Sequence, residues 1–191
     1  MAPKTKITKP EIIAAALDIV REAGAESLNA RAVAAKLNCS TQPVFSNFST
    51  MDELRESVIA AADDRYQKFL KRGMSDPQYP PYKASGIYYI RFALEEKELF
   101  KLLFMRDRTS EEIREEREKL SDLIALIAEN TGLSQDDAYL FHVEMWLYAH
   151  GIAVTIATSY LSWDWAMISR MLSDAYEGMR LRYQNRGSET E

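Results

Sequence analysis

Residues 27–54, SLNARAVAAKLNCSTQPVFSNFSTMDEL, contain two short helical patterns separated by a tight turn. Asn29 is a favourable N-cap for the first pattern, which ends at Asn38 after little more than two turns. Ser40 is expected to cap the second helix, and Pro43 falls in its first turn, where a missing N–H costs little. The spacing therefore predicts a closely joined pair of very short helices.

The second of these helices has an apolar side and a polar side. Val44, Phe45 and Phe48 are expected to pack, while small polar side chains face outward: Thr41, Gln42, Ser46 and Asn47. Hydroxyl and amide groups can bond to base edges and phosphates, and glutamine suits the N6/N7 edge of adenine. The pair is typical of a helix-turn-helix whose second helix enters the major groove, with an ordinary solvated helical hairpin as the alternative.

The flanking segments predict further helices. A capping box begins a helix over residues 8–24, and Ser49 and Thr50 begin a longer helix that ends near Gly73. Three of the six prolines fall in residues 74–81, which predicts an extended loop. Later helices are expected at about 82–95, 97–106, 110–131, 134–157 and 163–184.

No segment shows the alternation of a strand, so the predicted fold class is all-α. We expect an N-terminal three-helix helix-turn-helix domain, joined by a long helix to a C-terminal helical domain for ligand binding and dimerisation. The predicted boundaries are 1–50 for the DNA-binding domain, about 50–73 for the connecting helix, 74–184 for the regulatory domain and 185–191 for a disordered tail.

The hydrophobic content and the distribution of charge indicate what kind of protein this is. The chain has 191 residues, 47% of them hydrophobic, and a net charge of −5, divided between +2 for residues 1–50 and −7 for the remainder. A mildly basic head on an acidic body keeps non-specific attraction to phosphates weak, although such a division can also arise by chance.

Other classes of protein find little support in the sequence. Cys39 is the single cysteine, which rules out an internal disulfide and fits a reducing cytoplasm. We expect no membrane span and no cofactor or metal, and the motifs of common enzyme sites are not found. An enzyme is therefore not predicted.

The first 60 or so residues resemble the N-terminal domain of the TetR family of bacterial transcriptional regulators. The resemblance rests on Ala14-Ala-Ala-Leu17 and Gly24, on Val33-Ala34, and on Cys39-Ser-Thr-Gln-Pro-Val-Phe-Ser-Asn-Phe48 followed by Glu53-Leu54. The segment Met145-Trp-Leu-Tyr-Ala-His-Gly151 is more loosely similar to part of the ligand and dimerisation domain of some members.

This resemblance implies a homodimer, paired through the last two helices, that binds an inverted-repeat operator in double-stranded DNA. It also implies a repressor released by a small hydrophobic or aromatic effector. Thr41 and Gln42 would read bases, and phosphates or the nearby backbone would be contacted by other residues of the head: Lys4, Lys6, Asn29, Arg31, Ser40, Phe45, Ser46, Asn47 and Thr50. Backbone N–H groups of the helices capped by Asn29 and Ser49 would assist.

Three positions depart from the family pattern. Phe45 stands where a tyrosine usually contacts phosphate, Asn38 replaces a turn glycine, and Met51 replaces a lysine. Asparagine enters the left-handed backbone region more readily than most residues, so Asn38 is tolerable. The other two changes predict weaker, salt-sensitive DNA binding, and they leave open a helical interaction module that has lost DNA binding.

The body offers two further candidate surfaces. Small and methionine side chains along helices 134–157 and 163–184 could form the dimer interface or merely the internal core. An apolar effector pocket is predicted from Tyr89, Phe92, Phe104, Phe141, His142, Met145 and Trp146, with His142 as a polar anchor. Plain core packing, including a satisfied core histidine, is the alternative for this set.

Overall fold

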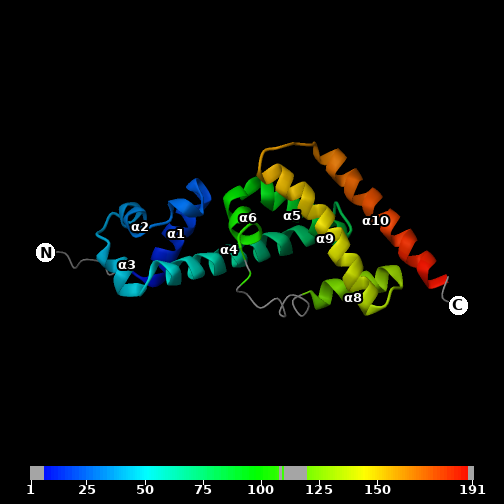
Figure 1. The fold of residues 1–191 in the computed structure, drawn as a ribbon, viewed down its shortest axis with the longest axis horizontal. Helices are drawn as coiled ribbons and strands as arrows, with labels where there is room; N and C mark the ends of the chain where they lie inside the picture. Colours follow the sequence, from blue (N-terminus) through cyan, green and yellow to red (C-terminus); the bar gives the residue numbers. More distant parts are fainter. Residues whose placement is uncertain (1–6, 108, 110–119, 189–191) are drawn as a thin grey trace. The chain divides into compact units, whose positions relative to one another are not determined.

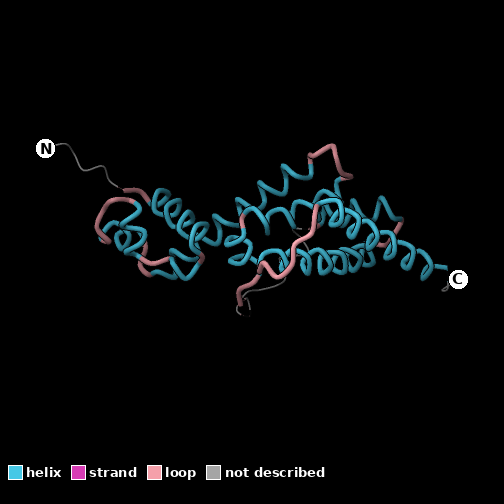
Figure 2. The backbone as a smooth tube through the Cα atoms, turned by 90° about the horizontal axis from the view of Figure 1, so that it is seen from above, coloured by secondary structure: helices cyan, strands magenta, loops and turns pink. Residues whose placement is uncertain are grey.

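The structure is a computed structural model that describes residues 7–107, 109 and 120–188. Helices and loops account for this described part, and no strand occurs in it (Figure 2). The chain forms two compact units, the first made of residues 1–68 and 95–106 and the second of residues 69–94 and 107–191. The fold class is all-α, as the sequence predicts.

The first unit is built around α1 (Lys9–Ala23), whose ends follow from its sequence. Thr8 and Glu11 form the predicted capping box, and Gly24 ends the helix at a φ of 83°, which suits a residue without a side chain. After α1 come η1 (Ala25–Ser27), α2 (Ala30–Lys36), α3 (Gln42–Asn47), the start of α4 (Met51–Met74) and, later in the chain, α6 (Lys97–Phe104).

Apolar side chains at helical spacing give this first unit its core. Ile12, Ala16 and Val20 of α1 are fully buried, and residues of α2, α3, α4 and α6 are buried in the same unit: Val33, Val44, Leu54, Val58, Leu99 and Phe100. Both α2 and α6 contact α1, and α3 contacts α2 (Figure 1). Helix α1 is therefore the support on which the short helices are placed.

The second unit contains the end of α4, α5 (Pro81–Glu95), α8 (Ser121–Thr131), α9 (Gln135–Ala157) and α10 (Trp165–Ser188). Helix α9 contacts both α8 and α10 (Figure 1). Gly73 permits the end of α4 to lie against α5, because a Cβ atom there would overlap the Tyr88 ring. Buried Phe92 and Phe141 contribute to the core of this unit.

The structure and the predicted elements differ in three segments of the chain. Residues 95–106, assigned by sequence to the C-terminal domain, lie in the first unit because the apolar side of α6 packs on α1. Helix α10 continues to Ser188, so residues 185–188 of the expected tail are helical. Much of the helix predicted over 110–131 lies outside the described residues, and its described part is α8.

Helix α9 is long and apolar enough to cross a membrane by length and composition alone. It carries nine buried residues and contacts two neighbouring helices, which is the arrangement of a core helix. Packing within the second unit therefore accounts for part of the apolar composition of α9.

Candidate nucleic-acid interface

Helices α2 and α3 form the predicted helix-turn-helix. The Asn29 side chain accepts a hydrogen bond from the Ala32 N–H at 3.0 Å, which confirms the expected N-cap of α2. In the turn, Asn38 has a φ of 50°, and the Cys39 N–H donates to the Ala34 carbonyl at 2.9 Å. The left-handed residue thus closes α2 and redirects the chain toward α3.

The two helices are held by a shared apolar face. Val33 and Ala34 of α2 are buried, as are Val44 of α3 and Phe48 directly after it. Burying one such side chain contributes on the order of 2 kcal/mol, so two helices of this length depend on tertiary packing rather than on helix propensity.

The outward side of α3 carries the predicted polar groups. Gln42 and Ser46 are exposed, and Thr41 and Asn47 are partly exposed. The Ser46 hydroxyl donates to the Gln42 carbonyl at 2.9 Å, and the Asn47 amide donates to the Pro43 carbonyl at 2.8 Å. Both bonds therefore lie within α3 itself.

Phe45 does not join the packed face, contrary to the prediction that it packs with Val44 and Phe48. Its side chain is 55% exposed, whereas the other two are buried. One more residue along a helix turns the side chain by about 100°, which carries Phe45 from the buried face toward the outward side of α3. It therefore lies on the candidate interface without a polar atom.

The N-terminal end of α3 also differs from the prediction. Thr41, not Ser40, occupies the N-cap position, and it makes no capping hydrogen bond through its side chain. Its φ of −72° and ψ of −12° are already helical, and its carbonyl accepts from the N–H groups of Val44 and Phe45. Ser40 is exposed one residue before the cap.

At the start of α4, Thr50 is the capping side chain. Its Oγ1 accepts from the Glu53 N–H at 3.1 Å, while the Glu53 carboxylate accepts from the Ser49 N–H at 2.7 Å. Of the two predicted caps, Thr50 is confirmed and Ser49 is wrong, and the Ser49 N–H is already bonded to the Glu53 carboxylate. The exposed Thr50 hydroxyl can still donate its proton to a phosphate.

Ion pairs reduce the positive charge of the first unit. Lys9 pairs with Glu53 at 2.9 Å, and Lys36 pairs with Glu22 at 2.9 Å. The Lys9 ammonium group, followed by the Ser49 N–H, holds the pKa of the Glu53 carboxyl below its usual value. Arg31, near the start of α2, is exposed, and the predicted arm residues Lys4 and Lys6 lie outside the described residues.

Two arginines hold one carboxylate at the junction of α5 and α6. Arg21 of α1 donates to both oxygens of Glu96, at 2.8 and 2.9 Å, and Arg65 of α4 donates to its Oε1 at 2.9 Å. Burial raises the pKa of Glu96, but the hydrogen bonds from Arg21 and Arg65 outweigh it, and the net shift is downward. Sequence spacing gave no sign of this cluster, because its members lie far apart in the chain.

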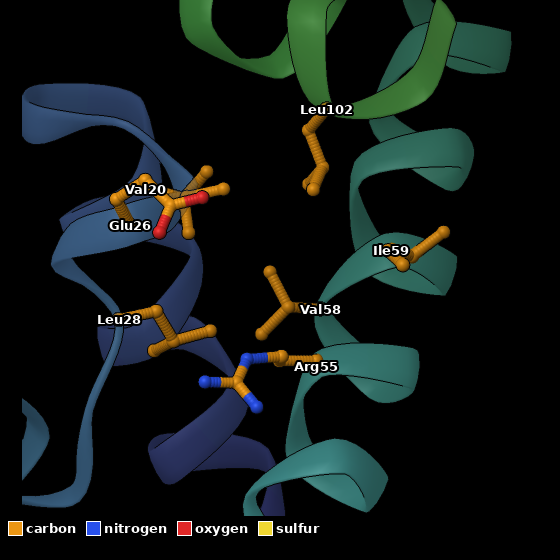
Figure 3. Close-up of a pocket in the computed structure, with 8 residues that line it drawn as sticks. Val20, Glu26, Leu28, Arg55, Val58, Ile59 and Leu102 are labelled. Carbon is orange, nitrogen blue, oxygen red and sulfur yellow. The ribbon is translucent and has the colours of Figure 1, made fainter. Parts of the chain in front are cut away.

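A cavity of about 270 Å³ lies inside the first unit. The side chains of Leu28 and Val58 point toward one another across it (Figure 3). Glu26 and Arg55 supply charged groups to its lining. None of the predicted effector residues lines this cavity, so it is separate from the expected ligand site.

Most of the predicted effector residues come together in the second unit. Tyr89, Phe92, Phe141, His142 and Met145 are buried there, and Trp146 is 38% exposed. Phe104 belongs instead to the first unit, where its ring lies edge-on to that of Tyr66 with centroids 5.1 Å apart. Its place in a separate apolar cluster follows from the packing of α6 on α1.

Tyrosines of α5 face both histidines of α9. The Tyr82 hydroxyl lies 3.3 Å from Nδ1 of His142, and the Tyr89 hydroxyl lies 2.8 Å from Nδ1 of His150. Burial lowers the pKa of both imidazoles. His142 is thus a satisfied core histidine in this conformation, and its tyrosine partner was missed because the pairing appears only once α5 and α9 are aligned.

The last two helices divide their small and apolar residues between core and surface. Three of the small residues of α9 that could have formed the dimer interface, Ala149, Ala153 and Ala157, are buried inside the unit, and so is Leu172 of α10. Large apolar side chains are nevertheless exposed on α9 and α10: Leu140, Leu147, Met167 and Leu181. Gly151 is exposed on α9 as well.

Comparisons with known proteins agree with this architecture. Residues 82–175 match the family described as "Tetracyclin repressor-like, C-terminal domain". A TetR-like transcriptional regulator from Rhodococcus sp. RHA1 is structurally similar, with a TM-score of 0.61 and 17% identity over 91% of this chain and 93% of that one.

A member of the TetR family from Streptomyces coelicolor A3 is also similar, with a TM-score of 0.59 and 18% identity over 87% of this chain and 96% of that chain. No curated protein matches the sequence significantly. At 17–18% identity, the structural similarity establishes the fold alone. The family match shows in addition that residues 82–175 are related in sequence to tetracyclin-repressor-like C-terminal domains. Residues 82–175 thus belong to a tetracyclin-repressor-like C-terminal domain, and the chain has the fold of TetR-like transcriptional regulators.

Proposed function

We propose that the protein is a homodimeric, sequence-specific DNA-binding regulator, acting in the cytoplasm as a repressor that a small hydrophobic or aromatic effector releases. The observation that carries the proposal is the α2–α3 pair, with Thr41 and Gln42 on its outward side and Val44 and Phe48 in the core. This arrangement supports insertion of α3 into the major groove.

In this proposal, Gln42 reads a base pair while hydroxyl and cationic groups position the head. Thr41 lies beside Gln42, and Thr50 and Arg31 are exposed where they can contact phosphates. Phosphate contacts position the protein on DNA, so the absence of a tyrosine hydroxyl at Phe45 and of a lysine ammonium group at Met51 should weaken binding to operator and random DNA alike. Binding is expected to be strongly salt-dependent.

Dimerisation brings two heads to one operator. The exposed apolar residues Leu140 and Leu147 of α9, with Met167 and Leu181 of α10, support pairing of these helices with the same helices of a second copy. A two-fold axis then requires an inverted repeat, with half-sites about one helical turn or a little more apart.

The effector is proposed to bind among α5, α9 and α10. The aromatic side chains of Phe92 and Phe141, with the Tyr82–His142 pair as a polar anchor, support a planar or apolar ligand that carries a hydrogen-bonding group. Entry of the ligand would displace packed side chains. Helix α4 has residues in both units, so a shift of its C-terminal end would alter the spacing of the two heads.

The test is selection of bound duplexes from a random-sequence DNA pool by the purified protein at two salt concentrations. An enriched inverted repeat, bound more weakly at the higher salt concentration, is the expected result. Absence of enrichment at low salt would contradict the proposal. It would favour the alternative suggested by Phe45, Met51 and the acidic net charge, a helical interaction module that has lost DNA binding.

A further inference from the structure

Phe45 is the large apolar side chain on the outward side of α3. Gln42, Phe45 and Ser46 are spaced three and four residues apart, so they share one side of the helix, and all three are exposed. The ring is 55% exposed between polar neighbours, whereas Val44 and Phe48 are almost fully buried, so little of its apolar surface is covered by its own unit. Its exposure on the same side of α3 as Gln42 and Ser46 leaves the ring available for contact with another molecule.

The chemistry of this side of α3 restricts what the ring can contact. A phenyl group has no donor for a phosphate oxygen, unlike the tyrosine that resembles it in shape. The hydroxyl of Ser46, the residue after Phe45, donates a hydrogen bond to the main-chain carbonyl of Gln42. In the major groove, the apolar feature that a base presents is the C5-methyl group of thymine.

We infer that Phe45 determines specificity by covering the C5-methyl group of a thymine in each operator half-site. This inference rests on the proposed DNA-binding function and adds to it a further base-reading residue beside Thr41 and Gln42. Gln42 and Phe45 are separated by about 4.5 Å along the helix axis, from a rise of about 1.5 Å per residue. The thymine should therefore lie within about two base pairs of the base pair that Gln42 reads.

The experiment uses the operator obtained by selection, with each thymine of the two half-sites replaced in turn by deoxyuridine. This replacement removes the methyl group and leaves every hydrogen-bonding group of the base pair in place. For the unchanged protein, replacing the thymine at one position of the half-site should weaken binding about three- to fivefold, which is the effect of burying one methyl group. Replacement at the other positions should have little effect.

Variants then assign the methyl contact to one residue. Phe45→Ala should bind the natural operator more weakly and lose the difference between thymine and uracil at that position. Phe45→Leu should keep much of this difference, because its side chain is still apolar. Gln42→Ala is the matched control: it should keep the uracil effect while losing preference at a neighbouring base pair.

Three results would overturn the inference. Equal binding of every uracil duplex by the unchanged protein would exclude a methyl contact, and a uracil effect that persists in Phe45→Ala would assign the contact to another residue. A change in oligomeric state of Phe45→Ala would indicate that the ring contacts protein instead. Failure of the initial selection is a separate result, since it removes the proposed DNA binding before any uracil is introduced.

Discussion

At the scale of single residues, Asn38 carries the turn between α2 and α3. Its φ of 50° lies in the left-handed region, which asparagine tolerates better than residues with branched side chains. The family pattern has a glycine at this position. The left-handed backbone conformation of Asn38 shows why asparagine can replace it.

Replacing Asn38 with glycine should leave the free energy of unfolding unchanged within about 0.5 kcal/mol, because both residues enter the left-handed region. Asn38→Val should lower it by about 1–2 kcal/mol, since a β-branched side chain is strained there. Urea unfolding followed by circular dichroism measures both variants. Equal stability of the valine and glycine variants would show that the turn does not need this conformation.

Variants of Gln42 and Arg31 should distinguish contacts that read bases from contacts that position the protein on the DNA backbone. Gln42→Ala is expected to cost about 1–3 kcal/mol of binding free energy at one base pair and to flatten preference there. Arg31→Ala should weaken binding to operator and random DNA alike and reduce the salt dependence. Titration of both DNA types at several salt concentrations distinguishes them; equal loss on both types for Gln42→Ala would refute its reading role.

Sequence reasoning at this scale succeeded where a pattern is local. Thr8, Glu11, Gly24 and Asn29 perform the predicted capping roles because each cap depends on a few neighbouring residues. The assignment of Ser40 was wrong by one residue, because Thr41 occupies the N-cap position of α3, and of the predicted pair Ser49 and Thr50 only Thr50 caps α4.

At the scale of elements, Glu96 joins α1, α4 and the α5–α6 junction. Its side chain is 9% exposed and is bonded by the partly exposed arginines Arg21 and Arg65. Removing the carboxylate takes the shared partner from both arginines and leaves Arg21 with the longer ion pair to Asp18 at 3.6 Å. One side chain therefore links the three segments, in addition to the packing of α6 on α1.

Glu96→Gln should lower the free energy of unfolding by about 1–2 kcal/mol, between the values for exposed and buried ion pairs. Glu98→Gln is the matched control, because it loses an i,i+3 pair with Lys101 and should change stability by less than about 0.5 kcal/mol. The lowered pKa of Glu96 means that this stabilisation is present above about pH 4.3 and is lost as pH falls further. Urea unfolding at pH 7 and pH 3.5 tests the difference, and equal effects of the two variants at pH 7 would contradict it.

The Tyr–His pairs between α5 and α9 predict a second pH dependence. Burial lowers the folded-state pKa of His142 and His150, so the unfolded chain takes up protons first as pH falls. Stability should be fully present above about pH 6.5 and decline below it. His142→Gln should flatten part of this decline, and replacing both histidines should flatten more. Thermal unfolding between pH 5 and 8 measures the slope; an unchanged slope in the double variant would exclude the imidazoles as its source.

Pairings between helices were predictable only in part. The lengths of α5 and α9 followed from apolar spacing, whereas the placement of α6 and Phe104 in the first unit depends on which of several apolar faces pack together. Periodicity identifies a face that is buried but not its neighbour. For the same reason, Ala149, Ala153 and Ala157 could not be separated from interface residues by sequence.

At the scale of the whole molecule, the proposed dimer depends on exposed apolar residues of α9 and α10. Leu147 is 56% exposed, and the exposed Gly151 lies one turn further along α9. A charge introduced at this point would be buried between two copies but solvated in a single chain. Dimerisation can therefore be tested without unfolding the protein.

Leu147→Glu should convert a dimer into a monomer at micromolar concentration and leave the helical content unchanged. Leu94→Glu, a change at a similarly exposed leucine of α5, serves as the control and should remain dimeric. Sedimentation velocity reports the mass of each variant, and circular dichroism reports folding. A Leu147→Glu variant that stays dimeric would place the interface elsewhere.

The first unit is assembled from two separate stretches of chain, residues 1–68 and 95–106, with the polypeptide of the other unit running between them. A fragment cut after α4 would lack α6, expose the apolar side of α1 and lose the partner of Arg21 and Arg65. Chimeric regulators made by exchanging heads at a single crossover point should therefore fold poorly. A graft that transfers residues 1–68 and 95–106 together keeps the first unit whole and should fold better.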